Sequence, residues 1–153
     1  MKNKEEILYQ EQQSFQLSTY PSVIILISIA LFYLTEGSPD DLPILTFVTL
    51  VIGICSLAFY KMTTTLTKDK LTISYGVGWI KKTYALKELK TAQTEEVNMP
   101  WYFGVGIRIT GNGWLYNTRP GKALKIPKKK GRYSIFIGTQ NKEDFLNSLK
   151  TIH

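Results

Sequence analysis

The sequence predicts an α+β protein in which a transmembrane helical hairpin precedes an antiparallel sheet of about seven strands, capped by a C-terminal helix. Three observations predict this fold class. Two runs of 19 residues lack charge, residues 61–153 alternate apolar and polar side chains, and residues 141–152 carry an apolar stripe. The chain therefore divides into a cytoplasmic N-terminal segment (1–16), a hairpin (17–60) and a cytoplasmic domain (61–153).

The two apolar runs, 17–35 and 42–60, have the length of membrane-spanning helices. Each would be roughly 28 Å long as a helix, close to the roughly 30 Å of a bilayer core. Both are apolar all round rather than along one stripe. A removed signal peptide is one alternative, but acidic residues precede the first run and no small-residue cleavage site follows it. Core helices of a soluble protein are the other, for which two adjacent uncharged runs would be unusual.

The distribution of charge predicts the orientation of the hairpin. The connection Glu36–Asp41 holds three acids and no basic residue, and Gly37 and Pro39 favour a turn there. Residues 61–153 carry 17 Lys and Arg against six Asp and Glu, a net +11, whereas residues 1–60 carry a net −4. Because cytoplasmic flanks carry the excess of Lys and Arg, we expect both termini on the cytoplasmic side of the cell (inner) membrane.

The domain after the hairpin reads as a succession of short strands. Period-two alternation bounded by Gly, Pro and Asn is typical of antiparallel strands with one buried face. The expected strands are Thr63–Thr67, Leu71–Tyr75, Ile80–Leu86, a weaker one near Leu89–Glu95, Ile107–Thr110, Ala123–Ile126 and Tyr133–Ile137.

The chain is expected to close with a helix from Asn141 to Ile152. Asn141 is a favourable N-cap, and two acids follow it in the first turn, where the helix dipole favours negative charge. Its apolar side chains recur with helical spacing and would cover an open end of the sheet. They are Phe145, Leu146, Leu149 and Ile152.

Nothing in the sequence indicates catalysis, a metal or a cofactor. Histidine occurs once, at His153, and cysteine once, at Cys55 inside the second apolar run, where a small buried residue is expected. No nucleophile–base pair or metal cluster can be assembled from these. The glycines of Gly76-Val77-Gly78 are followed by a strand-like segment rather than a helix, so they predict a hairpin turn and no phosphate loop.

A hydrophobic hairpin followed by LTISYGVGWIKKTYALKEL and YSIFIGTQNKEDFLNSL resembles the bacterial pleckstrin-homology-like (PH-like) family in its membrane-anchored form. The resemblance covers Thr63 to Ile152. It implies a seven-stranded, strongly bent antiparallel sheet capped by a helix, and little about a ligand. The first hairpin offers only Lys68-Asp69-Lys70, and the final helix lacks a tryptophan, so specific phosphoinositide binding is not implied.

Two groups of residues are candidates for binding. The basic group lies in IPKKKGRY and on the return strand after Gly78, and consists of Lys81, Lys82, Lys128, Lys129, Lys130 and Arg132. It is either a solvated feature that satisfies the positive-inside rule or a contact with anionic lipid headgroups, worth about 1 kcal/mol per lysine. The aromatic group is Trp101, Tyr102 and Phe103. It is either an interface anchor or a cover over the open sheet.

These observations predict a non-enzymatic integral membrane protein. Its PH-like domain would bind a protein partner or anionic lipid headgroups on the cytoplasmic face. A nucleic-acid-binding module that uses the basic domain is the alternative, and no recognised motif supports it.

Overall fold

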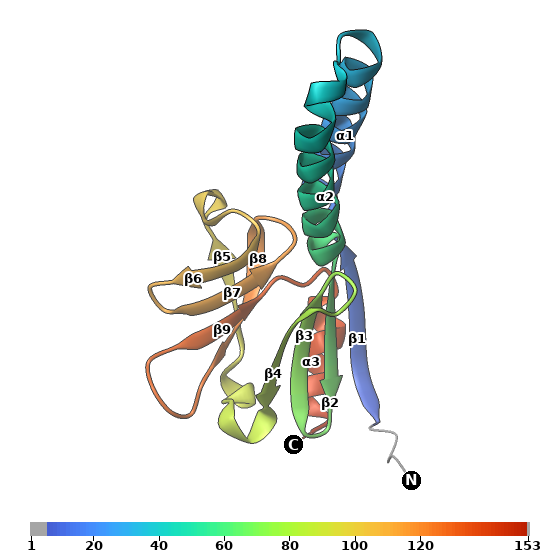
Figure 1. Cartoon of the computed structure of the whole chain (residues 1–153). Coiled ribbons are helices and arrows are strands. Elements are labelled where there is room, and N and C mark those ends of the chain that lie inside the picture. The colour runs from blue at the N-terminus through green and yellow to red at the C-terminus, as the bar shows by residue number, and fades with distance from the viewer. Residues whose placement is uncertain (1–5, 153) are drawn as a thin grey trace.

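A computed structural model describes residues 6–152 and, for residues 16–19, the backbone alone (Figure 1). The described residues exclude Lys2, Lys4 and Glu5, which count toward the charge before the first apolar run, and the single histidine, His153. The elements follow in the order β1 (Ile7–Ser14), α1 (Gln16–Thr35), η1 (Pro39–Asp41), α2 (Leu42–Phe59), β2 (Lys61–Thr67), β3 (Lys70–Tyr75), β4 (Ile80–Ala85), η2 (Leu86–Glu88), η3 (Thr91–Gln93), β5 (Glu95–Met99), η4 (Trp101–Phe103), β6 (Gly106–Thr110), β7 (Gly113–Asn117), β8 (Gly121–Pro127), β9 (Ser134–Ile137) and α3 (Lys142–Lys150).

Helices α1 and α2 lie side by side and project from the rest of the molecule (Figure 1). The helical segment Pro39–Phe59 is 21 residues long and apolar enough to cross a membrane, and its apolar stretch is not buried inside the molecule. The described side chains of α1 form a shorter apolar segment, Tyr20–Thr35. By length and composition, the described residues thus hold one helix that could span a bilayer, where the sequence predicts two.

Strand β1 was not expected from the sequence. It pairs antiparallel with β2, with Gln12 opposite Thr63, so the helices are inserted in the connection between two neighbouring strands. The division at residue 61 therefore leaves one strand outside the domain. The inward positions of β1 include the polar Glu11 and Gln13, which removed the apolar alternation by which a strand is recognised.

The strands form two sheets rather than one bent sheet. The described residues hold nine strands, in the orders β1-β2-β3-β4 and β5-β8-β9-β7-β6, whereas about seven were expected. The second sheet is mixed, because β7 and β9 run parallel. The strand expected near Leu89–Glu95 is not formed: η2 precedes this stretch, the short turn η3 lies within it, and β5 begins only at Glu95, so the chain changes sheets at this point.

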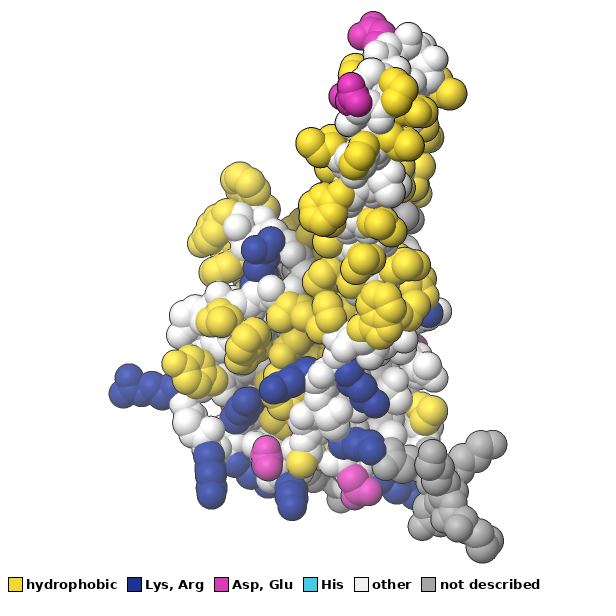
Figure 2. Space-filling model, viewed as in Figure 1, with side chains coloured by type: hydrophobic (Ala, Val, Ile, Leu, Met, Phe, Trp, Pro, Cys, Tyr) yellow, Lys and Arg dark blue, Asp and Glu magenta, His cyan; other side chains and the backbone are white. Residues whose placement is uncertain are grey.

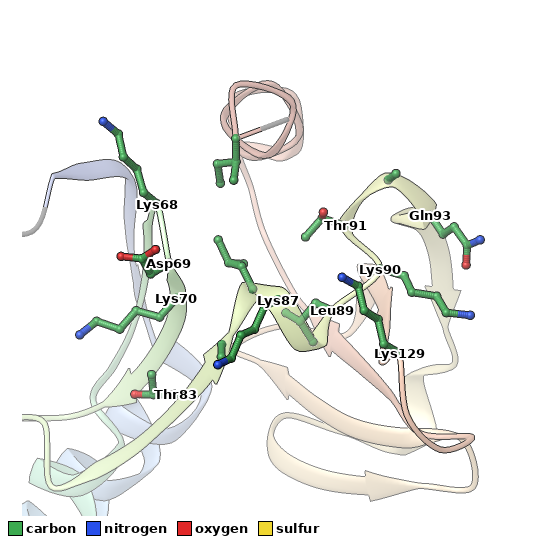
Figure 3. Close-up of a pocket in the computed structure, with 14 residues that line it drawn as sticks. Lys68, Asp69, Lys70, Thr83, Lys87, Leu89, Lys90, Thr91, Gln93 and Lys129 are labelled. Atoms are coloured by element: carbon green, nitrogen blue, oxygen red, sulfur yellow. The ribbon is translucent and has the colours of Figure 1, made fainter.

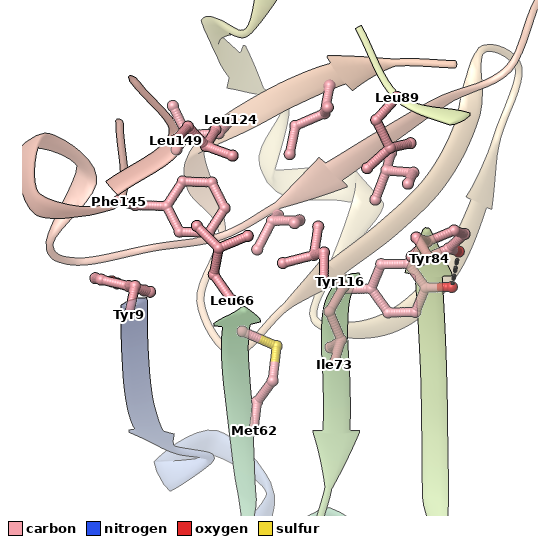
Figure 4. Packing of buried hydrophobic residues seen from close by; sticks show 14 of the residues in the cluster. Tyr9, Met62, Leu66, Ile73, Tyr84, Leu89, Tyr116, Leu124, Phe145 and Leu149 are labelled. Atoms are coloured by element: carbon pink, nitrogen blue, oxygen red, sulfur yellow. Dashed lines mark hydrogen bonds between the residues drawn. The ribbon is translucent and has the colours of Figure 1, made fainter. Parts of the chain in front are cut away.

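The main hydrophobic core lies between the two sheets and α3 (Figure 4). Ile73 of β3 and Leu124 of β8 face one another from opposite sheets, and Phe145 and Leu149 of α3 close the space. The tyrosines Tyr84 and Tyr116 join their hydroxyl groups at 2.7 Å across the core. The closing helix is confirmed with Asn141 at the N-cap position, but the side chain of this residue forms no capping hydrogen bond, and α3 ends at Lys150, two residues before the expected Ile152.

The glycines of the β3–β4 connection make a turn, as expected. Gly76 and Gly78 have φ angles of +59° and +95°, which side-chain-bearing residues rarely adopt. A Cβ atom at Gly76 would lie 2.1 Å from the carbonyl oxygen of Leu57, near the end of α2. The absence of a side chain therefore lets the turn pack directly against the base of the helical hairpin.

Candidate functional site

The end of the domain opposite the helical hairpin contains an open pocket of about 860 Å³. The β2–β3 turn, the end of β4, the η2–η3 segment and the residues after α3 surround it (Figures 1 and 3). Leu86 and Leu89 are buried among its lining residues, together with the half-buried Ile152. We call it the lysine pocket, because five lysines line it: Lys68, Lys70, Lys87, Lys90 and Lys129.

The sequence LKELK explains how the lysine pocket forms locally. Leu86 and Leu89 are buried, and this spacing leaves Lys87 and Lys90 exposed. The amide of Lys90 donates to the carbonyl of Pro127 at 2.8 Å. The amide of Lys129 in turn donates to the carbonyl of Glu88 at 2.8 Å. These two hydrogen bonds fasten the η2–η3 segment to the end of β8, and so bring Lys129 to a pocket whose other lysines lie far away in sequence.

The rim of the lysine pocket carries a surplus of positive charge. Lys68 forms an ion pair with Glu6, and this hydrogen-bonded partner raises the pKa of Lys68. Asp69 is the one acid among the lining residues. Across the range 6–152, Lys87, Lys90 and Lys129 have no carboxylate at ion-pair distance. These three ammonium groups can therefore bind an anion without first breaking an ion pair within the described part of the chain.

The four basic residues of the predicted turn, Lys128 to Lys130 and Arg132, have different surroundings. Lys128 lies with its ammonium group 5.1 Å from the ring centroid of the buried Tyr84, a cation–π contact. Lys129 lines the lysine pocket, while Lys130 and Arg132 are exposed outside it. The β8–β9 connection that carries them lies away from the helical hairpin (Figure 1).

The other two predicted lysines do not join this turn in one pocket. Lys81 and Lys82 lie on β4, opposite Ser74 and Ile73 of β3, and both are exposed. They line a smaller pocket of about 160 Å³ between β4 and the β6–β7 pair, where Trp114 is among their neighbours. The structure thus places Lys81 and Lys82 at one pocket and Lys129 at another.

The predicted aromatic group forms the short turn η4. Trp101 is 80% exposed and Tyr102 is 69% exposed, whereas Phe103 packs against a small core that includes Phe136. Trp79 in the β3–β4 turn is 64% exposed. Both turns lie on the side of the domain from which the helices project, and hydrophobic side chains gather there in Figure 2. We call Trp79, Trp101 and Tyr102 the aromatic face.

No protein-family model, curated protein or solved structure matches this chain. The function proposed below therefore rests on the positions and contacts of the described residues. Among the described residues no group of three or more His, Cys, Asp or Glu could hold a metal ion. Cys55, expected to be buried, is exposed on α2. Four of the five pocket lysines, Lys68, Lys70, Lys87 and Lys90, are not predicted from the sequence, although the LKELK pattern marks Lys87 and Lys90 as exposed neighbours of buried leucines.

Proposed function

We propose that this chain is a non-enzymatic, membrane-anchored binding module. Helices α1 and α2 insert as a hairpin into the cell (inner) membrane, and the two-sheet domain lies on the cytoplasmic side with both termini. The observation that carries the proposal is the helical segment Pro39–Phe59, whose apolar stretch packs beside α1 but is not buried inside the molecule. Soluble proteins rarely leave apolar patches above a few hundred Å² in water, so lipid is the fitting environment.

The polar groups within the helices support insertion into lipid. The hydroxyl of Ser28 donates to the carbonyl of Ile24 at 2.9 Å, and the hydroxyl of Ser56 donates to that of Ile52 at 2.8 Å. In a bilayer core no water is present to satisfy such groups, so bonding within the helix removes the penalty. The same side chains would need no such arrangement on a helix in water.

The charges at the two ends of the helices favour the proposed orientation. Glu36, Asp40 and Asp41 lie at the tip of the hairpin, where Figure 2 shows acidic side chains. The basic domain lies at the other end. This distribution agrees with the positive-inside rule, with the tip outside and the domain in the cytoplasm.

The aromatic face favours contact between the domain and the membrane surface. Tryptophan and tyrosine are enriched where hydrocarbon meets water, because their rings are apolar and their tips polar. With α1 and α2 inserted, Trp101 and Trp79 lie on the side of the domain toward the bilayer. The lysine pocket then opens toward the cytoplasm, which favours a protein partner over lipid headgroups as the ligand of this pocket.

The proposal includes membership of the membrane-anchored PH-like family, which rests on the resemblance of the sequence; the mixed second sheet departs from the antiparallel sheet that the family implies, whereas the closing helix agrees with it. A four-stranded antiparallel sheet packs with a second sheet, and a C-terminal helix covers the core between them. The hairpin leaves the domain between its first two strands. In this proposal the PH-like domain supplies a rigid scaffold, and the anchor fixes which surface faces the cytoplasm.

Cysteine labelling in sealed, right-side-out bacterial cells or spheroplasts tests the topology. In a Cys55→Ser background, Ser38→Cys at the hairpin tip should react with a membrane-impermeant maleimide. Lys130→Cys on the β8–β9 turn is the matched control, and should react only after the membrane is permeabilised. Release of the full chain by alkaline carbonate, or equal labelling of the two variants from outside, would show that the hairpin does not span the membrane.

A further inference from the structure

The lysine pocket combines an apolar floor with positive charge on opposite sides. Figure 3 shows Lys68 and Lys70 on one side, Lys90 and Lys129 on the other, and Lys87 between them. Buried leucines form the floor between these sides. A ligand that fits this arrangement carries several negative charges separated by apolar groups, rather than a single compact charge.

Strand β4 adds a second feature that a ligand could use. It pairs with β3 on one side, and within the described part of the chain no strand pairs with its other side. Thr83 and Ala85 of β4 line the lysine pocket, while Ile80 and Lys82 line the smaller pocket. An exposed strand edge presents unpaired amide and carbonyl groups, which an extended peptide can join as an additional strand.

From these features we infer that the lysine pocket and the edge of β4 together form a docking site for an extended, acidic segment of a partner protein. Backbone groups of the segment pair with β4. Its carboxylates lie against Lys87, Lys90 and Lys129, and an apolar side chain rests on Leu86 and Leu89. Within the described residues, the free edge of β4 has no strand partner and the three ammonium groups have no carboxylate at ion-pair distance, so the segment would supply partners for both.

Two observations favour an acidic peptide over a phosphate-bearing ligand. All the cations that line the pocket are lysines, whereas tight recognition of phosphate commonly uses the planar, bidentate guanidinium of arginine. The pocket is also much larger than one phosphate group and has an apolar floor. Lipid headgroups of the anchoring membrane are excluded by orientation, because the pocket opens away from the helices; this step rests on the proposed function.

The test uses the full chain in detergent micelles and a fluorescein-labelled peptide of alternating glutamate and valine, roughly ten residues long to follow one edge strand. Binding is measured by fluorescence anisotropy at several salt concentrations. The variant Lys87→Glu/Lys90→Glu should raise the Kd about 10-fold, since two rim charges change sign. Amide hydrogen exchange in β4 should slow when the peptide binds.

The control variant Lys130→Glu/Arg132→Glu changes the net charge equally on the exposed β8–β9 turn and should shift the Kd by about twofold or less. Equal weakening by both variants would reduce the binding to net charge and overturn the inference. Displacement of the peptide by inorganic phosphate at constant ionic strength, or by anionic lipid added to the micelles at lower concentration than the peptide needs, would assign the pocket to those ligands instead. If the peptide does not bind, the docking site is contradicted but the proposed membrane topology is not, because binding is measured in detergent. The cysteine-labelling experiment tests the topology separately.

Discussion

At the scale of single residues, a buried carboxylate joins the first strand to the segment before the last helix. Glu11 on β1 is 7% exposed. Its Oε2 atom accepts hydrogen bonds from the hydroxyl groups of Tyr9 at 2.8 Å and Thr139 at 2.7 Å, and its Oε1 atom accepts one from the amide of Gln140 at 2.8 Å. Gln13 adds a bond to the carbonyl of Gly138 at 2.8 Å. Residues that look unsuited to a core therefore fix the position of β1.

Replacing Glu11 with alanine should destabilise the domain by about 3 kcal/mol, because three donors lose their acceptor in a buried site. Glu11→Gln should lower the free energy of unfolding by less than Glu11→Ala, since one oxygen acceptor remains. Urea unfolding of the full chain in detergent, monitored by near-ultraviolet circular dichroism, measures the free energy of unfolding. The exposed Glu88→Ala change is the control and should stay within about 0.5 kcal/mol of the wild type. A Glu11→Ala loss as small as that of the control would show that the network contributes little.

At the scale of elements, one exposed carboxylate connects β5, β8 and α3. Glu96 of β5 accepts Lys122 of β8 at 2.8 Å and Lys142 of α3 at 2.6 Å. Hydrogen bonds from Lys122 and then Lys142 lower the pKa of Glu96 to about 2. The first turn of α3 is thereby tied to the second sheet, while Phe145 and Leu149 hold its other face in the core.

The depressed pKa of Glu96 predicts a pH-dependent contribution to stability. Because the folded pKa lies below the unfolded value of about 4.3, the contribution is present above that value and is lost as the pH falls toward 2. The difference in melting temperature between the wild type and Glu96→Gln should therefore be largest near pH 6 and shrink below pH 4. Glu88→Gln controls for the loss of one negative charge. A wild-type advantage that persists unchanged at pH 2.5 would contradict the assignment.

At the scale of the whole molecule, the two ends of the domain have different chemistry. The helices project from one side of the domain, and the β2–β3 turn and the η2–η3 segment, which line the lysine pocket, lie at the opposite end (Figure 1). Hydrophobic side chains gather on the side of the helices (Figure 2). Gly76 allows the β3–β4 turn to touch the end of α2, so the domain is held close to the base of the helices. We expect a domain held in this way to lie against the bilayer in one preferred orientation.

The three tryptophans report this orientation. In vesicles that contain lipids brominated near the headgroup end of the chains, a variant that retains only Trp101 should be quenched strongly, because this side chain would lie at the interface. A variant that retains only Trp114, which is 38% exposed on β7, should be quenched less. Phenylalanine replaces the other two tryptophans in each variant. Equal quenching of Trp101 and Trp114 would mean that the domain does not dock through the aromatic face.

Local pattern in the sequence was sufficient for several elements. The apolar run 42–60 predicts α2, alternation predicts β2, β3, β6 and β9, and the apolar stripe after Asn141 predicts α3. Each of these depends on side chains that are neighbours in sequence, so composition and periodicity contain the information. The turn at Gly76 and Gly78 follows in the same way, from the conformational freedom of glycine.

Only the tertiary structure decided the rest. Strand β1 exists because β2 pairs with its backbone and residues 138–140 form hydrogen bonds with its polar side chains, and neither interaction is visible in ILYQEQQS. The division into two sheets depends on where η2 and η3 interrupt the pairing. The lysine pocket likewise forms when segments 68–70, 83–93 and 129 meet. The sequence by itself determined the apolar helix α2, several strands and the closing helix, because their patterns are local. Long-range pairing decided the sheet order and the lysine pocket.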